Sequence, residues 1–143
     1  MKKYVIRKGK HNVKRFPKIL WNIRAINLCF RFDSSAIYKT QNPLNQNDWN
    51  KLFGFSRGYH HHNSIRLAWR WNPKIEKIEL AKYMYKKGSR SYEIIGATDI
   101  NQSKTVKLEF NEGIPLCYLL YPFFGGDETA PHDIRIEIGY GFN

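Results

Sequence analysis

The 143 residues of this chain are enough for one domain with a buried core, and nine Tyr, nine Phe and four Trp favour strands over helices. No stretch reaches the roughly 18 consecutive apolar residues of a membrane span. Neither an apolar region nor a small-residue cleavage site follows the basic N-terminus, as would be typical of a secretory signal. We therefore expect a soluble, cytoplasmic protein that does not associate with membranes.

The formal net charge of +12 is distributed unevenly along the chain. Residues 1–32 hold ten Lys and Arg and no Asp or Glu, whereas residues 127–143 hold four acidic residues and one Arg. A basic stripe of this kind favours an acidic partner, such as nucleic acid, a nucleoprotein or an acidic protein surface. The alternative is a lysine-rich surface that only keeps a small protein in solution.

Residues 1–18 are predicted to form an extended basic arm, followed by a β-sandwich domain over residues 19–143. Gly9 and Pro17 interrupt any helix in the arm, and only its residues 4–6 have weak strand character. The basic residues of the arm are the first candidates for contact with an acidic partner. They are Lys2, Lys3, Arg7, Lys8, Lys10, Lys14, Arg15 and Lys18.

Alternation of apolar and polar side chains predicts strands along most of the remaining chain. The pattern is strictest in SIRLAWRW (64–71), where every second residue from Ile65 onward is large and apolar. The segment CYLLYPFF (117–124) is apolar on both faces, which is typical of a central strand. The other predicted strands are 26–32, 75–85, 90–100, 104–110 and 133–140.

Turn residues separate these strands. The segment KKGS (86–89) predicts a hairpin turn in which glycine supplies a positive φ. We predict loops over the polar segment 41–48 and over 49–58, the latter because of Gly54 and Gly58.

Short alternating strands without a convincing helix predict an all-β fold. Specifically, they favour a single-domain antiparallel β-sandwich of jelly-roll type. The two cysteines, Cys29 and Cys117, lie far apart in predicted core strands. We expect free thiols, with one disulfide as the alternative.

Three consecutive histidines, His60, His61 and His62, precede the strand at 64–71. In an extended chain His60 and His62 project to one side, and such a pair binds zinc or copper when a third ligand joins it. Nothing in the spacing selects that ligand, so we expect hydrogen-bonding histidines at the end of a strand, no metal site and no cofactor. The candidates for a third ligand are His132, Asp133 and Asp127.

The residue patterns of common enzymes are missing from the chain. Glu76 and Glu79 are three residues apart in a predicted strand and so point to opposite faces, unlike the paired carboxylates of a glycosidase. No glycine-rich phosphate loop and no GxSxG motif occurs. We expect no enzymatic activity. A metal-dependent hydrolase that combines the histidines 60–62 with His132 and Asp133 stays open as a third interpretation.

Arg66 and Arg70 share one face of the strand at 64–71, and Lys82 and Tyr83 follow on the next strand. Cationic and aromatic groups interleaved on a sheet can bind nucleic acid, because the cations contact phosphates and the rings stack on bases. Alternation places Trp69 and Trp71 on the opposite face. We therefore expect the tryptophans in the core and the arginines in solvent, where they would assist the basic arm.

Two segments, HHHNSIRLAWRWN (60–72) and YLLYPFFGGDETAPHDIRIEI (118–138), resemble a set of small uncharacterised β-rich proteins from Bacteroidetes-type bacteria and their phages. The long strand, Gly-Gly loop and final strand at the C-terminus are also similar to concanavalin-type jelly rolls. The paired carboxylates of the glucanases with that architecture are missing here. The resemblance implies a fold and no chemistry.

The expected function is non-enzymatic binding of RNA or of a ribonucleoprotein. The small size, the Lys/Asn/Ile-rich composition and the basic arm suit a phage-encoded inhibitor of an RNA-guided, CRISPR-type defence nuclease. The alternative is a carbohydrate-binding, concanavalin-like module. In that case exposed Trp49, Trp71 or Tyr121 would stack on sugar rings, and the loop 125–133 would hold an ion.

Overall fold

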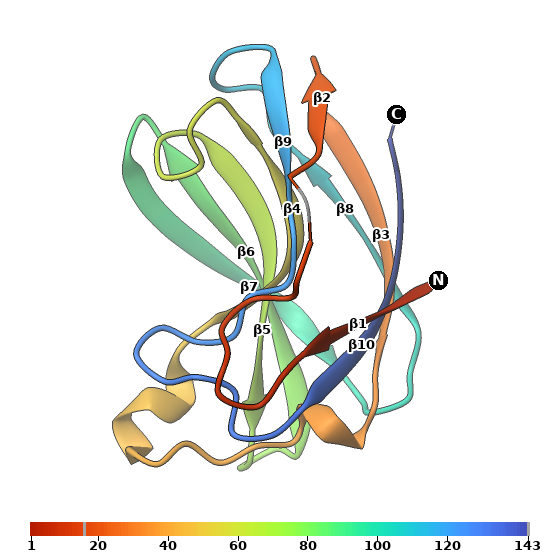
Figure 1. Ribbon diagram of the computed structural model, residues 1–143, viewed down its shortest axis with the longest axis vertical. Coiled ribbons are helices and arrows are strands. Elements are labelled where there is room, and N and C mark those ends of the chain that lie inside the picture. Colours follow the sequence, from red (N-terminus) through yellow and green to blue (C-terminus); the bar gives the residue numbers. More distant parts are fainter. Residues whose placement is uncertain (16, 143) are drawn as a thin grey trace.

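The computed structural model describes residues 1–15 and 17–142, which form two antiparallel sheets packed face to face (Figure 1). Sheet A has the order β1-β10-β3-β8, and sheet B has the order β2-β9-β4-β5-β6-β7. The strands are β1 (Lys2–Ile6), β2 (Ile19–Trp21), β3 (Ala25–Phe32), β4 (Asn50–Arg57), β5 (Ser64–Asn72), β6 (Lys77–Lys86), β7 (Ser89–Thr98), β8 (Lys104–Glu109), β9 (Leu116–Leu120) and β10 (Ile134–Phe142). The predicted all-β antiparallel sandwich is confirmed.

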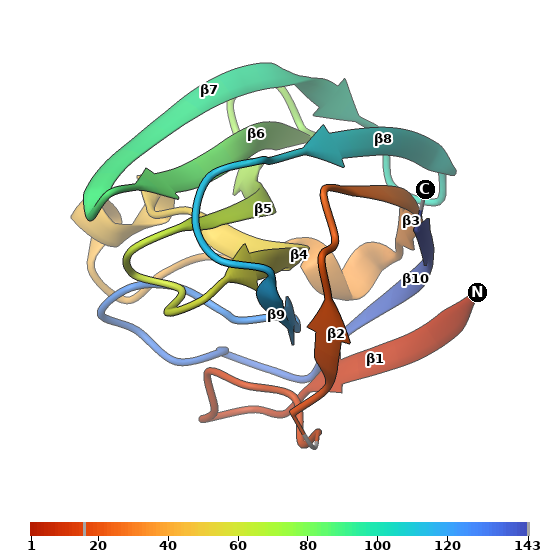
Figure 2. The ribbon, with the colours of Figure 1, turned by 90° about the horizontal axis from the view of Figure 1, so that it is seen from above.

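The strand order is that of a jelly roll with one added hairpin. When β6 and β7 are set aside, β1 pairs with β10, β2 with β9, β3 with β8 and β4 with β5. This nested pairing folds the chain as one long hairpin that wraps across two sheets, which is the jelly-roll arrangement. The hairpin β6–β7 then widens sheet B beyond sheet A (Figure 2).

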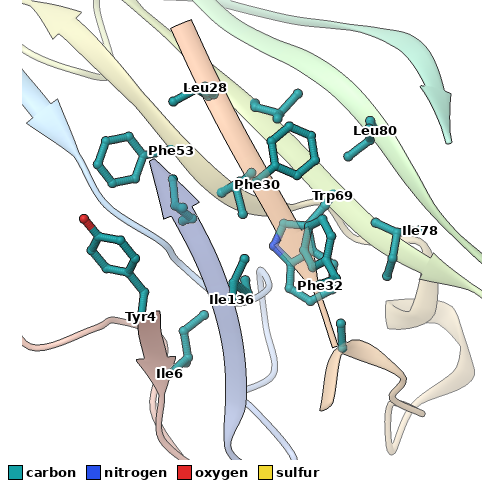
Figure 3. Close-up of a cluster of buried hydrophobic side chains, with 14 of the residues drawn as sticks. Tyr4, Ile6, Leu28, Phe30, Phe32, Phe53, Trp69, Ile78, Leu80 and Ile136 are labelled. Carbon is teal, nitrogen blue, oxygen red and sulfur yellow. The ribbon is translucent and has the colours of Figure 1, made fainter. Parts of the chain in front are cut away.

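The core between the sheets consists of aromatic and branched side chains (Figure 3). Trp69 on β5 is fully buried, and its ring centroid lies 4.9 Å from that of Phe32 and 5.8 Å from that of Tyr38. Trp71 on the same face is 8% exposed. Both tryptophans therefore lie in the core, as the alternation in β5 predicts.

The prediction of a loop over residues 49–58 is wrong. Residues 50–57 form β4, a buried strand that is hydrogen-bonded to β9 on one side and β5 on the other. Gly54 does not mark a turn here. A Cβ at this position would collide with the carbonyl oxygen of Ile65, so the glycine allows two backbones to approach closely.

The basic N-terminal segment is attached to the sandwich. Lys2–Ile6 form β1, which pairs with β10 along its whole length, and Tyr4 and Ile6 are buried. The following residues lie against the loop 122–131: Gly9 N donates to Ala130 O at 2.8 Å, and Phe124 N donates to His11 O at 2.7 Å (Figure 1). The described part of this segment is thus held in place by backbone hydrogen bonds.

The β6–β7 hairpin turns at Lys87 and Gly88, where the sequence predicts a turn. Their φ angles of 50° and 80° are both positive, which is typical of the two-residue turns that fit the twist of a hairpin. Most of β7 is exposed on both faces. β7 therefore contributes little to the core, whereas Ile78 and Leu80 of β6 belong to it.

The helical parts of the described chain are two short 3₁₀ turns, η1 (Ser34–Ala36) and η2 (Pro43–Asn47). The side chain of Asn42 caps η2 by accepting a hydrogen bond from the Leu44 amide. Over residues 1–15 and 17–142, no helix has the length and apolarity needed to cross a membrane.

The two cysteines are free thiols, as predicted. Cys29 lies half-buried on β3 of sheet A, whereas Cys117 is buried on β9 of sheet B. The Cys117 Sγ donates to the Pro115 carbonyl oxygen at 3.2 Å.

The close approach at Gly54 leads to a test of the fold. We expect Gly54→Ala to lower the free energy of unfolding by at least about 2 kcal/mol, because two paired strands would have to separate locally. Gly141→Ala is the matched control, since a Cβ there meets no atom within 4 Å. Urea denaturation followed by tryptophan fluorescence measures both. Equal stabilities of the two variants would contradict this account of β4.

Candidate functional site

The outer face of sheet B carries a cluster of cationic and aromatic side chains. In the strand register Arg66 on β5 lies opposite Tyr83 on β6, and Tyr83 lies opposite Tyr92 on β7. Side chains at paired positions share a face of the sheet, so these three point away from the core. We call the following residues the outer-face cluster: Trp49, Lys51, Arg66, Arg70, Tyr83, Tyr85, Arg90 and Tyr92.

Small residues form the floor of this cluster. Ala68 and Ala81 are paired directly across β5 and β6, and both are fully buried. Trp49 and Tyr83 pack over them as a second apolar cluster, separate from the main core. Because the alanines project so little from the sheet, the rings of Trp49 and Tyr83 lie close to its outer face.

Trp49 is covered by its neighbours and is only 7% exposed. The Arg70 guanidinium lies 4.0 Å from its ring centroid, and the Tyr92 ring lies 5.6 Å away. Arg70 in turn donates to Glu79 Oε1 at 3.0 Å and to the Asn47 carbonyl oxygen at 2.9 Å. The expectation that Arg70 extends freely into solvent is therefore wrong, because this residue is half-buried and paired.

Lys51 lies at the centre of the cluster. Its Nζ donates to the Trp49 carbonyl oxygen at 3.0 Å and lies 4.5 Å from the centroid of the Tyr83 ring. Burial, together with the positive charges of Arg66 and Arg90, lowers the pKa of Lys51 to about 8. Within residues 1–15 and 17–142, none of these three cations forms an ion pair with a carboxylate.

Arg66 is half-buried, and a histidine is its neighbour. Its Nη2 lies 3.4 Å from His60 Nδ1. Burial, the charge of Arg66 and the nearby His61 lower the pKa of His60 to about 4, so the imidazole is neutral at pH 7. Nδ1 then accepts from the guanidinium, and the proton of the ring is on Nε2. Arg66 was also expected in solvent, but the turn between β4 and β5 partly covers it.

Two pockets lie on this face, and both have Lys51 and Tyr83 among their walls. One of about 610 Å³ extends toward Tyr92 and the acidic Asp48 and Asp127. The other, of about 340 Å³, extends toward Arg66 and the histidine turn. The loops that border these pockets lie on the side of sheet B that faces away from sheet A (Figure 2).

A third pocket, of about 690 Å³, lies along the basic N-terminal segment. Lys10, Lys14 and Arg15 line it, and Arg15 lies 4.8 Å from the Tyr4 ring centroid. Asn12 lines both this pocket and the one beside Arg66. The three pockets therefore adjoin one another, from β7 to the N-terminal segment.

The other basic residues of the predicted arm have separate positions. Lys2 and Lys3 are exposed on β1. Arg7 forms a 3.0 Å ion pair with Asp133, whose other oxygen accepts from the Lys8 amide at 2.8 Å. Lys18 lies 5.8 Å from the Tyr140 ring centroid. The structure thus brings Lys10, Lys14 and Arg15 together in one pocket, which Arg7 also lines although it is paired with an acidic residue.

The weak metal candidates His60, His62, His132 and Asp133 do not meet. His60 and His62 lie in the turn before β5, whereas His132 Nε2 is 2.7 Å from the Ser35 carbonyl oxygen at η1. Across the described residues no three His, Cys, Asp or Glu side chains are arranged to hold a metal ion. The hydrolase interpretation therefore lacks the constellation that it requires.

The aromatic residues expected to stack on sugar rings are not exposed. Trp49 and Trp71 are buried, and Tyr121 is half-buried against Tyr4. In the loop 125–133 the Glu128 carboxylate accepts from the amides of residues 41 and 42 and from the side chain of residue 45. This carboxylate anchors the turn η2.

The sequence interpretation missed Lys51, Tyr85, Arg90 and Tyr92. A two-residue turn at 87–88 fixes the register of the β6–β7 hairpin, so Tyr85 had to face Arg90 and Tyr83 had to face Tyr92. The turn was predicted from the sequence, so these two pairs could have been predicted as well. Lys82, which the sequence suggested as a neighbour of the arginines, lies on the other face of β6, opposite Leu67.

No family model, curated protein or solved structure matches this chain. The function is therefore inferred from the chemistry of the outer-face cluster.

The depressed pKa of His60 predicts how stability depends on pH. The folded value of about 4 lies below the ordinary 6.5, so the unfolded chain binds the proton first as the pH falls. We expect the free energy of unfolding to decrease between about pH 6.5 and pH 4. In His60→Gln this decrease is smaller. Urea denaturation at a series of pH values measures it, with His62→Gln, at an exposed position, as the control. Identical pH profiles for His60→Gln and the unaltered protein would contradict the buried, neutral imidazole.

Proposed function

We propose that this protein is a non-enzymatic RNA-binding protein that contacts RNA, free or within a ribonucleoprotein, through the outer face of sheet B. One observation carries the proposal. Lys51 interacts electrostatically with Arg66 and Arg90, and among the described residues none of these three cations forms an ion pair with a carboxylate; Asp48 acts on Lys51 only from a greater distance.

Holding like charges together costs free energy unless an anion joins them. The lowered pKa of Lys51 expresses this cost, because burial and two neighbouring guanidinium groups disfavour its charged form. Arg70, on the same face, already forms an ion pair with the Glu79 carboxylate. Phosphate groups of a nucleic acid would supply the missing negative charge for the other cations.

The aromatic part of the cluster favours single-stranded nucleic acid. Tyr92 is 55% exposed, and Tyr59 beside the histidine turn is 66% exposed. Bases stack on such rings when they are free of a duplex, because inside a duplex the faces of each base are covered by the neighbouring stacked bases. A single strand is therefore the form of RNA that we expect to bind.

The adjoining pockets support a polymeric ligand. The pocket beside Arg66 shares Lys51 with one neighbouring pocket and Asn12 with the other. A strand that lies on the outer face of sheet B would continue past Asn12 to Lys10 and Lys14. In this way the basic segment extends the site.

A more specific role is inhibition of an RNA-guided nuclease. The small size and the charge of +12 support this proposal. Cleavage of a target DNA by such a nuclease, measured with and without this protein, tests it directly. Full cleavage at a large excess of the protein would exclude the nuclease used.

The RNA-binding proposal is tested with two sets of variants. We expect Lys51→Gln combined with Arg90→Gln to weaken binding to a mixed single-stranded RNA pool by about tenfold or more. The slope of log affinity against log salt should fall by roughly 0.7 for each phosphate contact that is lost. Serine at positions 8, 10, 14 and 15 should weaken binding as well. Fluorescence anisotropy at two salt concentrations measures the affinities.

The control is Arg31→Gln combined with Lys107→Gln, which removes the same charge from the outer face of sheet A. If this control weakened binding as much as the Lys51 and Arg90 pair, the outer face of sheet B would not be the site. Salt-insensitive binding to a neutral polysaccharide, without RNA binding, would favour the carbohydrate alternative.

A further inference from the structure

We propose that the pocket beside Arg66 binds a phosphate monoester, namely the terminal phosphate of a bound RNA strand. This inference rests on the proposed function, since the phosphate is taken to be the end of the same RNA. We call this pocket, of about 340 Å³, the terminal-phosphate pocket. Its polar wall is formed by Lys51, His60, Ser64, Arg66, Tyr83 and Tyr85.

The charge at the pocket exceeds that of one phosphodiester. Lys51 and Arg66 line it, and Lys51 also interacts electrostatically with Arg90, which donates to the Tyr83 hydroxyl at 3.4 Å. A phosphodiester carries a single negative charge, whereas a phosphate monoester carries about 1.5 to 2 negative charges near pH 7. The two cations that line the pocket, Lys51 and Arg66, form no ion pair among the described residues, and with Arg90 in the adjoining pocket they match the monoester more closely.

Hydrogen-bond donors are also available. The guanidinium of Arg66 has five N–H groups, and among the described residues its one hydrogen bond runs from Nη2 to His60 Nδ1. Since His60 accepts at Nδ1, its Nε2 carries a proton and is a neutral donor. A monoester presents three terminal oxygens, and a planar guanidinium beside neutral donors is well suited to bind them.

The pocket is bounded at both sides by stacked rings. His60 and His61 stack at 4.1 Å between centroids, and His61 lies 5.4 Å from the Tyr85 ring. At the other side Phe123 is fixed by His11, which stacks on it at 5.1 Å. The turn between β4 and β5 thus forms a wall beside Arg66.

The size of the pocket agrees with the end of a strand. Its 340 Å³ lie at the lower limit of the roughly 300–1,000 Å³ typical of small-ligand sites. This space accommodates a phosphate and part of its nucleotide, and a longer strand must continue into the neighbouring pockets. A carboxylate of an acidic peptide would supply only one negative charge and fewer acceptor oxygens.

The test uses one RNA sequence with three kinds of end: a 5′-phosphate, a 3′-phosphate, and hydroxyls at both ends. We expect one of the phosphorylated RNAs to bind at least about tenfold more tightly than the hydroxyl-ended RNA at 0.15 M salt. Inorganic phosphate at millimolar concentration should reduce this preference and leave the binding of hydroxyl-ended RNA unchanged. The RNA that shows the preference identifies the end that is bound.

Arg66→Gln should remove most of the preference. Arg90→Gln, at an exposed position on β7, should reduce it without affecting folding, which circular dichroism verifies. Arg31→Gln, on sheet A, is the matched control and should keep the full preference.

The two proposals fail in different ways. Equal affinity for all three RNAs would overturn the terminal-phosphate pocket and leave RNA binding in place. Binding to none of them would overturn both. A preference that survives in folded Arg66→Gln and Arg90→Gln would place the phosphate elsewhere and so overturn this inference.

Discussion

One strand, β5, connects the core to the candidate site, and the alternation of its side chains is the constraint on which the rest of the structure depends. Trp69 and Trp71 point inward and pack against sheet A, while Arg66 and Arg70 point outward. The strands on both sides of β5 fix its register, so the outward side chains have no freedom to exchange faces. The sandwich therefore positions the two arginines as firmly as it positions the two tryptophans.

The regular strands were predictable from the sequence. The alternation in β3, β5, β8 and β10 is strict, and each of these strands has one face in the core. In β4 the alternation fails for a physical reason, because the register with β5 shifts between Lys51 and Phe53. Trp49 and Lys51 consequently lie on the outer face, whereas Phe53 and Phe55 lie in the core, although all four have the same parity. An alternation of period two in the sequence cannot reveal such a change of face within one segment.

The distribution of charge along the chain indicated only part of the candidate site. The basic segment at the N-terminus has the highest density of Lys and Arg, yet Arg7 there is paired with Asp133. The outer-face cations of sheet B that form no ion pair within the described part of the chain come from β4, β5 and β7, which are separated in sequence. Proximity of this kind is created by strand pairing, so a count of charges along the chain does not reveal it. The pairing of Arg70 with Glu79 was hidden for the same reason, since these residues meet across β5 and β6.

The position of β7 at the edge of sheet B, outside the nested jelly-roll pairs, places part of the candidate site on a strand that contributes little to the core. Arg90 and Tyr92 belong to β7, whereas Ile78 and Leu80 of the neighbouring β6 lie in the main core. Because β7 is exposed on both faces, its side chains are free to vary in size and charge with little penalty to folding. The other strands of sheet B thus support the candidate site, and β7 is the part of it in which side chains can be exchanged while that support stays the same.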